Sequence, residues 1–186
     1  MKKLIVFTPF VLLSSSLPAQ GVFSNNTISC LEKVIRDYPH RFAGISGELI
    51  KKTARETDFQ SRIRLGGSKY CKVTRHEISG SGNSYSWDCI VLETGNHDSA
   101  LNTFRELFSQ MKNSIIRLPG DKPAILNSAC DKPAEDLVIF DLLPARGETR
   151  KLRVSLSIQN EGTLWLVSIH VYEGEFPGEE PVLANH

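Results

Sequence analysis

The chain has 186 residues, with 22 lysines and arginines against 21 aspartates and glutamates, and 40% of its residues are hydrophobic. This composition is typical of one globular domain and excludes a collagen, a coiled coil and a disordered chain. Because positive and negative charges nearly balance, the composition also excludes a strongly basic nucleic-acid-binding module, and we expect no nucleic-acid partner.

Residues 1–19 are predicted to be a secretory signal peptide. Lys2 and Lys3 form its positive start, an apolar stretch of about ten residues follows, and Ala19 ends a small-residue cleavage site. The apolar stretch is shorter than the roughly twenty residues that cross a bilayer. We therefore expect a secreted or periplasmic bacterial protein with no membrane attachment after cleavage, a single α+β domain over 20–176 and a flexible tail over 177–186.

Four cysteines agree with export from the cytosol. Cys30, Cys71, Cys89 and Cys130 contain no CxxC pair, so their spacing disfavours a zinc or redox site, and we expect neither a metal nor a cofactor. An even number of cysteines in an oxidising compartment predicts disulfides. The connectivity that we expect is Cys71–Cys89 together with Cys30–Cys130.

The first of these bridges depends on the register of a predicted β-hairpin. Residues 69–77 and 85–93 are strand-like, and the segment between them is rich in Gly, Ser and Asn. A turn centred on Gly80 places Cys71 opposite Cys89, within bridging reach. A turn centred between Ser81 and Gly82 places Cys71 opposite Leu92 instead.

Two amphipathic helices are predicted from apolar residues spaced three and four apart. The first begins after a cap at Asn26 or Thr27 and ends at Pro39, and the second begins after Asn96 or Asp98 and continues through Ile115 to Pro119. The segment 42–50 is expected to be extended or irregular, and 119–133 is expected to be a loop. Further strands are predicted over 61–67, 136–144, 151–160 and 163–173.

The last two of these strands differ in their hydrophobic pattern. The strand at 163–173 is apolar at nearly every position, which predicts a central strand. The strand at 151–160 alternates, which predicts one buried and one wet face. Its buried face is expected to carry Leu152, Val154, Leu156 and Ile158, and its wet face Arg153, Ser155, Ser157 and Gln159.

The order of elements is a helix with three strands, followed by a helix with three strands. Because hairpin-length connections join antiparallel strands, this order predicts an α+β two-layer sandwich with a mainly antiparallel sheet and two principal helices. The segments 58–93 and 136–173 have similar lengths and layouts, so an internal α-β-β-β duplication is a hypothesis. The layout is similar to the secretion-chaperone-like fold, and this likeness of fold implies nothing about function.

Two histidines are the candidates for catalysis. His170 lies within the apolar final strand and His76 within the first strand of the hairpin. An imidazole that titrates near neutral pH serves as a base when a carboxylate orients it, and Asp88 or Asp141 is the expected carboxylate. The more common role of such a residue is that of a structural histidine with satisfied hydrogen bonds.

Three function classes follow from these patterns. We expect a non-enzymatic module that binds a protein partner through a sheet face or an edge strand, because no complete catalytic motif is present. The alternatives are a small exported hydrolase that uses a histidine base and a carrier of a small ligand. Trp87 and Trp165 are expected to fill the core, and an exposed tryptophan would instead anchor a partner.

Overall fold

The computed structural model describes residues 22–78, 82–118, 120, 122–133 and 136–174. The predicted signal peptide (1–19), the turn that contains Gly80 and the predicted tail (177–186) lie outside the described residues.

One antiparallel sheet of nine strands forms one layer of the protein. The strands follow the order β1-β2-β3-β4-β9-β8-β7-β6-β5, so that β4 and β9 lie at its centre. The elements are α1 (Val22–Asp37), η1 (Tyr38–His40), β1 (Ser46–Lys52), β2 (Glu56–Ser61), β3 (Tyr70–Ile78), β4 (Gly82–Thr94), α2 (His97–Met111), β5 (Ile115–Ile116), β6 (Ala124–Ser128), β7 (Leu137–Leu143), η2 (Gly147–Lys151), β8 (Leu152–Glu161) and β9 (Leu164–Glu173).

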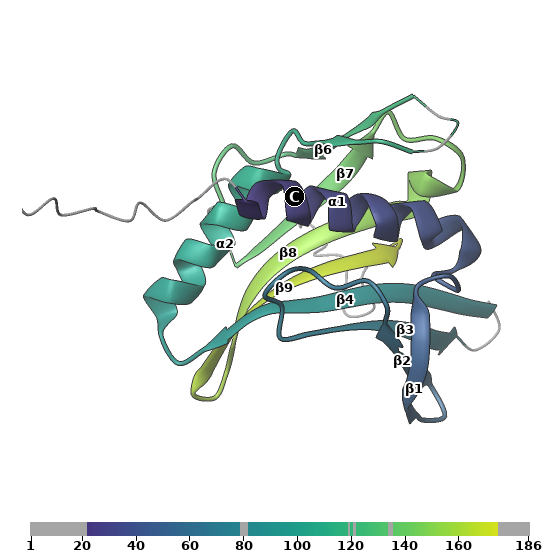
Figure 1. Ribbon diagram of the computed structural model, residues 1–186, viewed down its shortest axis with the longest axis horizontal. Coiled ribbons are helices and arrows are strands. Elements are labelled where there is room, and N and C mark those ends of the chain that lie inside the picture. Colours follow the sequence, from purple (N-terminus) through teal and green to yellow (C-terminus); the bar gives the residue numbers. More distant parts are fainter. Residues whose placement is uncertain (1–21, 79–81, 119, 121, 134–135, 175–186) are drawn as a thin grey trace, which may run out of the picture.

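The two α-helices form the second layer, and both lie on the same side of the sheet (Figure 1). Their apolar stripes and the inward side chains of the strands make one core, in which Leu31, Phe104 and Trp87 are buried. This arrangement confirms the predicted two-layer α+β fold with an antiparallel sheet. Within the described residues, neither helix is long and apolar enough to span a bilayer.

The N-terminal half differs from the prediction at two places. Helix α1 begins at Val22, before the expected caps, and Thr27 lies inside it, where its hydroxyl donates a hydrogen bond to Gln110 Oε1 of α2 at 2.9 Å. The strand expected over 61–67 is wrong, because β2 ends at Ser61 and the following residues form a loop. The segment 42–50 contains the start of β1, which pairs only with β2.

The β3–β4 hairpin confirms the first of the two predicted registers. Cys71 lies opposite Cys89 and Val73 opposite Trp87. A disulfide joins Cys71 to Cys89, and both cysteines are buried in the core.

The C-terminal half contains two strands that the sequence pattern missed. Helix α2 is capped by Asn96, which accepts a hydrogen bond from the Ser99 N–H at 2.9 Å, and it ends at Met111. Asn113 takes the left-handed conformation (φ 60°) that turns the chain out of the helix, so Ile115 starts β5 and does not continue α2. The segment 119–133, expected to be a loop, contains β6.

The last two strands agree with their predicted roles, with one correction. Strand β9 is central, and the four apolar residues of β8 face the core. However, Ser155 and Ser157 on the face expected to be wet are buried, with exposed fractions of 1% and 2%. Strand β8 lies inside the sheet, where Ser155 is flanked by Ile139 of β7 and His170 of β9, and these larger side chains shield a small serine.

The two halves of the chain have the same plan. Each begins with a helix on the same side of the sheet and continues as a meander from one edge to the centre, where β4 and β9 pair. The halves contain four and five strands, so the expected count of three strands in each was wrong. The shared plan is what an internal duplication requires, and the duplication stays a hypothesis.

Candidate functional site

The candidate site is a groove on the face of the sheet opposite the helices, called here the open face. The groove has a volume of about 570 Å³ and crosses β3, β4 and β9. Side chains of these strands alternate between the core and the open face, because successive residues of a strand point to opposite sides. The groove has apolar and aromatic walls from Tyr70, Ile90, Leu166 and Tyr172, and polar groups from Lys72, Thr74, His76, Ser86, Asp88, Ser168 and His170.

The centre of the groove contains a histidine–carboxylate pair. Asp88 of β4 lies directly opposite His170 of β9, and the His170 Nδ1 is 2.8 Å from the Asp88 Oδ1. About a fifth of each side chain is exposed. The prediction that Asp88 is a carboxylate partner of His170 is therefore realised in the geometry, although the two residues are 82 positions apart in sequence.

A polar network extends from this pair across β4, β3 and β2. The Ser86 hydroxyl donates to the Asp88 Oδ2 at 3.0 Å, and the Thr74 hydroxyl donates to the Asp58 Oδ1 at 2.8 Å. The Lys72 ammonium lies 3.0 Å from the Asp58 Oδ2. Each of the two carboxylates in the network therefore accepts a hydrogen bond from a hydroxyl, and Asp58 also pairs with the Lys72 ammonium.

His76 joins the same network from its outer side. Its Nε2 lies 3.3 Å from the Ser86 hydroxyl, and its Nδ1 lies 3.4 Å from the Glu56 Oε1. Ser86 therefore lies between two histidine–carboxylate pairs. The sequence indicated both histidines, whereas it did not indicate Ser86, which projects from β4 on the same face as Asp88.

The network shifts the ionisation of its charged members. Burial alone would raise the pKa of Asp88, but the hydrogen bonds from His170 and Ser86 and the charge of Lys72 outweigh burial and lower that pKa. Burial would likewise lower the pKa of Lys72, and the hydrogen bond and charge of Asp58 raise it instead. Both side chains are therefore held in their charged forms at neutral pH.

A strip of exposed apolar residues continues the open face beyond the groove. This apolar strip lies on β5, β6 and β7 and consists of Ile115, Ile125, Leu137, Ile139 and Leu143. Between the strip and the groove lie Ser155 and Ser157 of β8, whose buried hydroxyls have no hydrogen-bond partner in the described part of the chain. Buried hydroxyls without partners are rare in native proteins.

Other predicted residues lie away from the groove. Asp141 pairs with Arg153 at 3.0 Å and does not contact a histidine. Trp87 is fully buried, and its indole N–H donates to the Ser61 hydroxyl at 2.9 Å. Trp165 is half-buried and packs against the His97 ring.

The second predicted disulfide is not formed in the structure. Cys30 is buried in α1, and Cys130 follows β6, where its Sγ lies 3.0 Å from the Ser128 hydroxyl. Both thiols belong to or contact the same core. The Cys30–Cys130 bridge stays a prediction, and mass mapping of the unreduced protein tests it.

Two kinds of chemistry are open to this site. The Asp88–His170 pair has the geometry in which a carboxylate orients an imidazole for proton transfer. The groove also has the size and the mixture of apolar walls and few polar groups that binding sites have. Among the described residues, no cluster of three or more histidines, cysteines or acids is placed to hold a metal ion.

Comparison with protein-family models, with curated proteins and with solved structures finds no match to this chain. Function is therefore inferred from the site itself.

Proposed function

We propose that this protein is an exported binding module that holds a basic segment of a partner protein on its open face. The observation that carries this proposal is that both helices lie on one side of the sheet (Figure 1), while the other side presents a groove and, beyond β8, an exposed apolar strip. Contiguous exposed apolar residues beside polar groups are typical of protein interaction sites.

The charge of the groove favours a basic partner. Carboxylates of Glu56, Asp88, Glu161 and Glu173 line it, against the single ammonium of Lys72. A lysine or arginine of the partner would lay its aliphatic stem along Leu166 and direct its charge at these carboxylates. The same charge would repel nucleic-acid phosphates.

The face is a better binding surface than the edges of the sheet. Edge strand β1 pairs with β2 through two register shifts and ends in Lys51 and Lys52, and both features discourage the addition of another strand. The opposite edge strand, β5, has two residues.

Export is part of the proposal. The Cys71–Cys89 disulfide and the leader pattern of residues 1–19 support a secreted or periplasmic location. The intact mass and N-terminal sequence of the mature protein test this part, and an uncleaved leader would contradict it.

Site-specific photo-crosslinking tests the binding function. A benzoylphenylalanine is placed at Leu166 in the groove, at Ile139 in the strip or at Arg105 on the exposed side of α2, in the organism that produces the protein. We expect crosslinks from Leu166 and Ile139 to one protein, through a segment rich in lysine or arginine and apolar residues. Crosslinks from Arg105 alone, or an acidic crosslinked segment, would contradict the proposal.

A charge change provides the matched control. Glu161→Lys reduces the negative charge of the groove and is expected to weaken the crosslink from Leu166, whereas Glu106→Lys on α2 leaves it unchanged. Because the attraction is electrostatic, added salt is expected to weaken the complex as well.

A second candidate function, hydrolysis, is favoured by one specific observation. Ser155 lies directly opposite His170, so Asp88, His170 and Ser155 follow one another across three neighbouring strands. In this reading His170 takes the Ser155 proton as Ser155 attacks a carbonyl carbon. The second candidate ranks lower because backbone N–H groups within these strands already donate to the sheet and are not free to stabilise an oxyanion.

Covalent labelling separates the two functions. A fluorophosphonate probe is expected to label Ser155 in a hydrolase, and the labelling would disappear in His170→Ala. A protein that is unlabelled, or labelled equally with and without His170, excludes this hydrolase. The third candidate, a small-ligand carrier, stays a prediction. Its expected cavity between the helices and the sheet is occupied by core side chains in the described part of the chain.

A further inference from the structure

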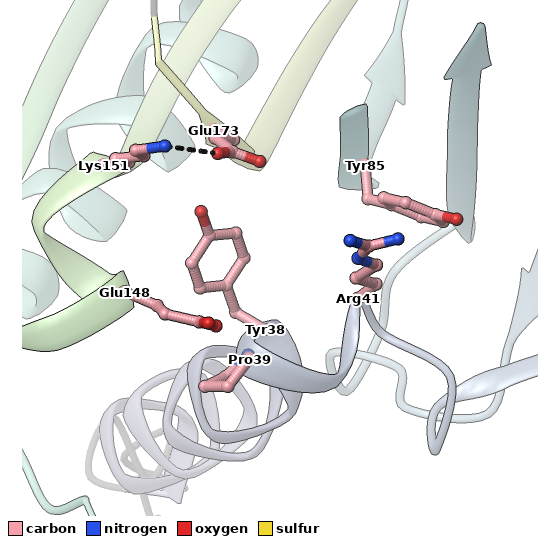
Figure 2. A pocket seen from close by; sticks show the side chains of 7 residues that line it. All are labelled: Tyr38, Pro39, Arg41, Tyr85, Glu148, Lys151 and Glu173. Carbon is pink, nitrogen blue, oxygen red and sulfur yellow. Dashed lines mark ion pairs between the residues drawn. The ribbon is translucent and has the colours of Figure 1, made fainter. Parts of the chain in front are cut away.

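A second pocket lies at one end of the sheet and shares Tyr85 and Glu173 with the edge of the open-face groove, whereas Tyr38, Pro39, Arg41, Glu148 and Lys151 line it alone. It has a volume of about 250 Å³ and is formed where η1 and η2 approach the ends of β4 and β9 (Figure 2). Tyr38, Pro39, Arg41, Tyr85, Glu148, Lys151 and Glu173 line it. Two aromatic rings and charges of both signs thus meet in a small space.

One end of this pocket is acidic. Glu173 forms an ion pair with Lys151 at 3.5 Å, and the Tyr38 hydroxyl points toward the Glu173 carboxylate (Figure 2). Burial, followed by the charges of Glu173 and Glu148, raises the pKa of Tyr38 to about 12, so this hydroxyl keeps its proton. Among the described residues, no cation lies within ion-pair distance of Glu148. The acidic end therefore has more negative charge than Lys151 neutralises.

The other end contains an arginine held in place by its backbone. Arg41 and Phe42 both adopt left-handed backbone conformations (φ 56° and 58°), which residues other than glycine rarely adopt. The Arg41 N–H donates to the Tyr38 carbonyl at 2.7 Å, and Phe42 is fully buried, so the surrounding structure fixes this turn. Backbone conformations of this kind persist at sites where a side chain must be positioned.

Arg41 points its guanidinium toward Tyr85 and lacks a carboxylate partner. The guanidinium carbon lies 5.9 Å from the centre of the Tyr85 ring, and within the described ranges no acidic oxygen lies within ion-pair distance of Arg41. Figure 2 shows Arg41 and Tyr85 on one side of the pocket and Tyr38 on the other, with Glu173 beyond the Tyr38 hydroxyl. An unpaired guanidinium and a carboxylate therefore border the same space without meeting.

We propose that this pocket binds a free α-amino acid in its zwitterionic form. The ligand carboxylate accepts two hydrogen bonds from the Arg41 guanidinium, whose planar fork matches a carboxylate. The ligand ammonium donates to Glu173, with Glu148 adding negative charge nearby. The ligand side chain packs on the rings of Tyr38 and Tyr85. A residue within a peptide does not carry both an ammonium and a carboxylate group on its α-carbon, so the proposed ligand is a free amino acid.

Nuclear magnetic resonance titration tests the proposal. The mature protein, labelled with ¹⁵N, is titrated with each of the twenty L-amino acids at millimolar concentration. We expect saturable shifts of the Arg41 side-chain and backbone signals with at least one amino acid. The N-acetyl form and the C-terminal amide of that amino acid, each lacking one charge, are expected to bind at least about tenfold more weakly.

Matched variants assign the site. Arg41→Gln and Glu173→Gln are each expected to weaken binding at least about tenfold, since each removes a charge-assisted hydrogen bond. Arg105→Gln, on an exposed position of α2, is expected to leave it unchanged. Arg41→Lys keeps the positive charge but lacks the planar guanidinium with its two parallel donors, so it is expected to bind with intermediate affinity. This variant keeps the test valid if Arg41→Gln does not fold.

Three results would overturn the proposal: no amino acid shifts these signals, a capped form binds as tightly as the free amino acid, or binding survives in Arg41→Gln. Failure here is separate from failure of the partner-binding function, because Arg41 is not among the residues that line the open-face groove. The Leu166 crosslink is expected in Arg41→Gln as in the unchanged protein.

Discussion

The carboxylate at the centre of the groove provides the sharpest test of the site geometry. Asp88→Asn preserves the shape of the side chain and removes its charge, so the 2.8 Å contact with His170 and the 3.0 Å contact with Ser86 lose their charged acceptor. A hydrogen bond to a charged group contributes about 1.5–3 kcal/mol. Because about a fifth of the Asp88 side chain is exposed, we expect a loss of about 2 kcal/mol in the free energy of unfolding at pH 7.

The sign of the pH dependence follows from the lowered pKa of Asp88. The unfolded carboxyl ionises near its ordinary pKa of 3.8, and the folded carboxyl ionises below it. The stabilisation by Asp88 is therefore complete above pH 3.8 and is lost as the pH falls through the folded value. The difference between the unchanged protein and Asp88→Asn is expected to be full at pH 7 and to shrink in strong acid.

Urea unfolding at pH 7 and at a series of lower pH values measures this difference in the free energy of unfolding, and thermal unfolding at pH 7 measures it independently. At pH 7 the melting temperature is expected to fall by about 4–8 °C for a domain of this size. Asp141→Asn is the control, because the Asp141–Arg153 pair is half exposed and is expected to contribute less than about 1 kcal/mol. A loss below about 0.5 kcal/mol in Asp88→Asn, or an equal loss in the control, would refute the geometry given for the groove.

Three further predictions concern the framework that carries the two sites. Removal of the disulfide by Cys71→Ala with Cys89→Ala is expected to cost about 3 kcal/mol, because the bridge closes a separation of 18 residues; a cost below about 1 kcal/mol in urea unfolding would contradict this. Asn96→Ala removes the cap of α2 and is expected to cost about 1 kcal/mol, measured by thermal unfolding, whereas an unchanged melting temperature would show that the cap is dispensable. Trp87→Phe leaves a small cavity and removes the hydrogen bond from the indole N–H to the Ser61 hydroxyl, with an expected cost of about 2 kcal/mol in urea; a neutral variant would contradict the buried position of the indole.

Local patterns predicted the parts of the fold that depend on local sequence. The hairpin itself was predicted, with two possible registers of which the structure shows the first, and the alternating residues of β8 and the apolar β9 indicated their positions in the sheet. The pattern failed at β5 and β6, which are two and five residues long, too short for alternation to show. It also extended α2 to Ile115, because the left-handed turn at Asn113 carries no glycine to signal it.

The candidate site depends on contacts that no local pattern reveals. Asp88 and His170 were each indicated by residue type, but their contact exists because β4 and β9 pair at the centre of the sheet. Ser155 was expected to be wet, since period-two alternation describes the two faces of a strand and not the size of neighbouring side chains. The pocket at Arg41 was not predicted, because it requires η1 and η2 to meet across the end of the sheet.

The central claim is that the open face binds the partner segment. Nuclear magnetic resonance of isoleucine methyl groups tests this claim most directly. The protein is labelled at its isoleucine methyl groups and mixed with a synthetic copy of the segment captured at Leu166. The predicted result is a set of saturable shifts at Ile90 in the groove and Ile139 in the strip, with Ile28 on α1 unchanged. Shifts confined to Ile28, or no shifts at the open face, would contradict the claim.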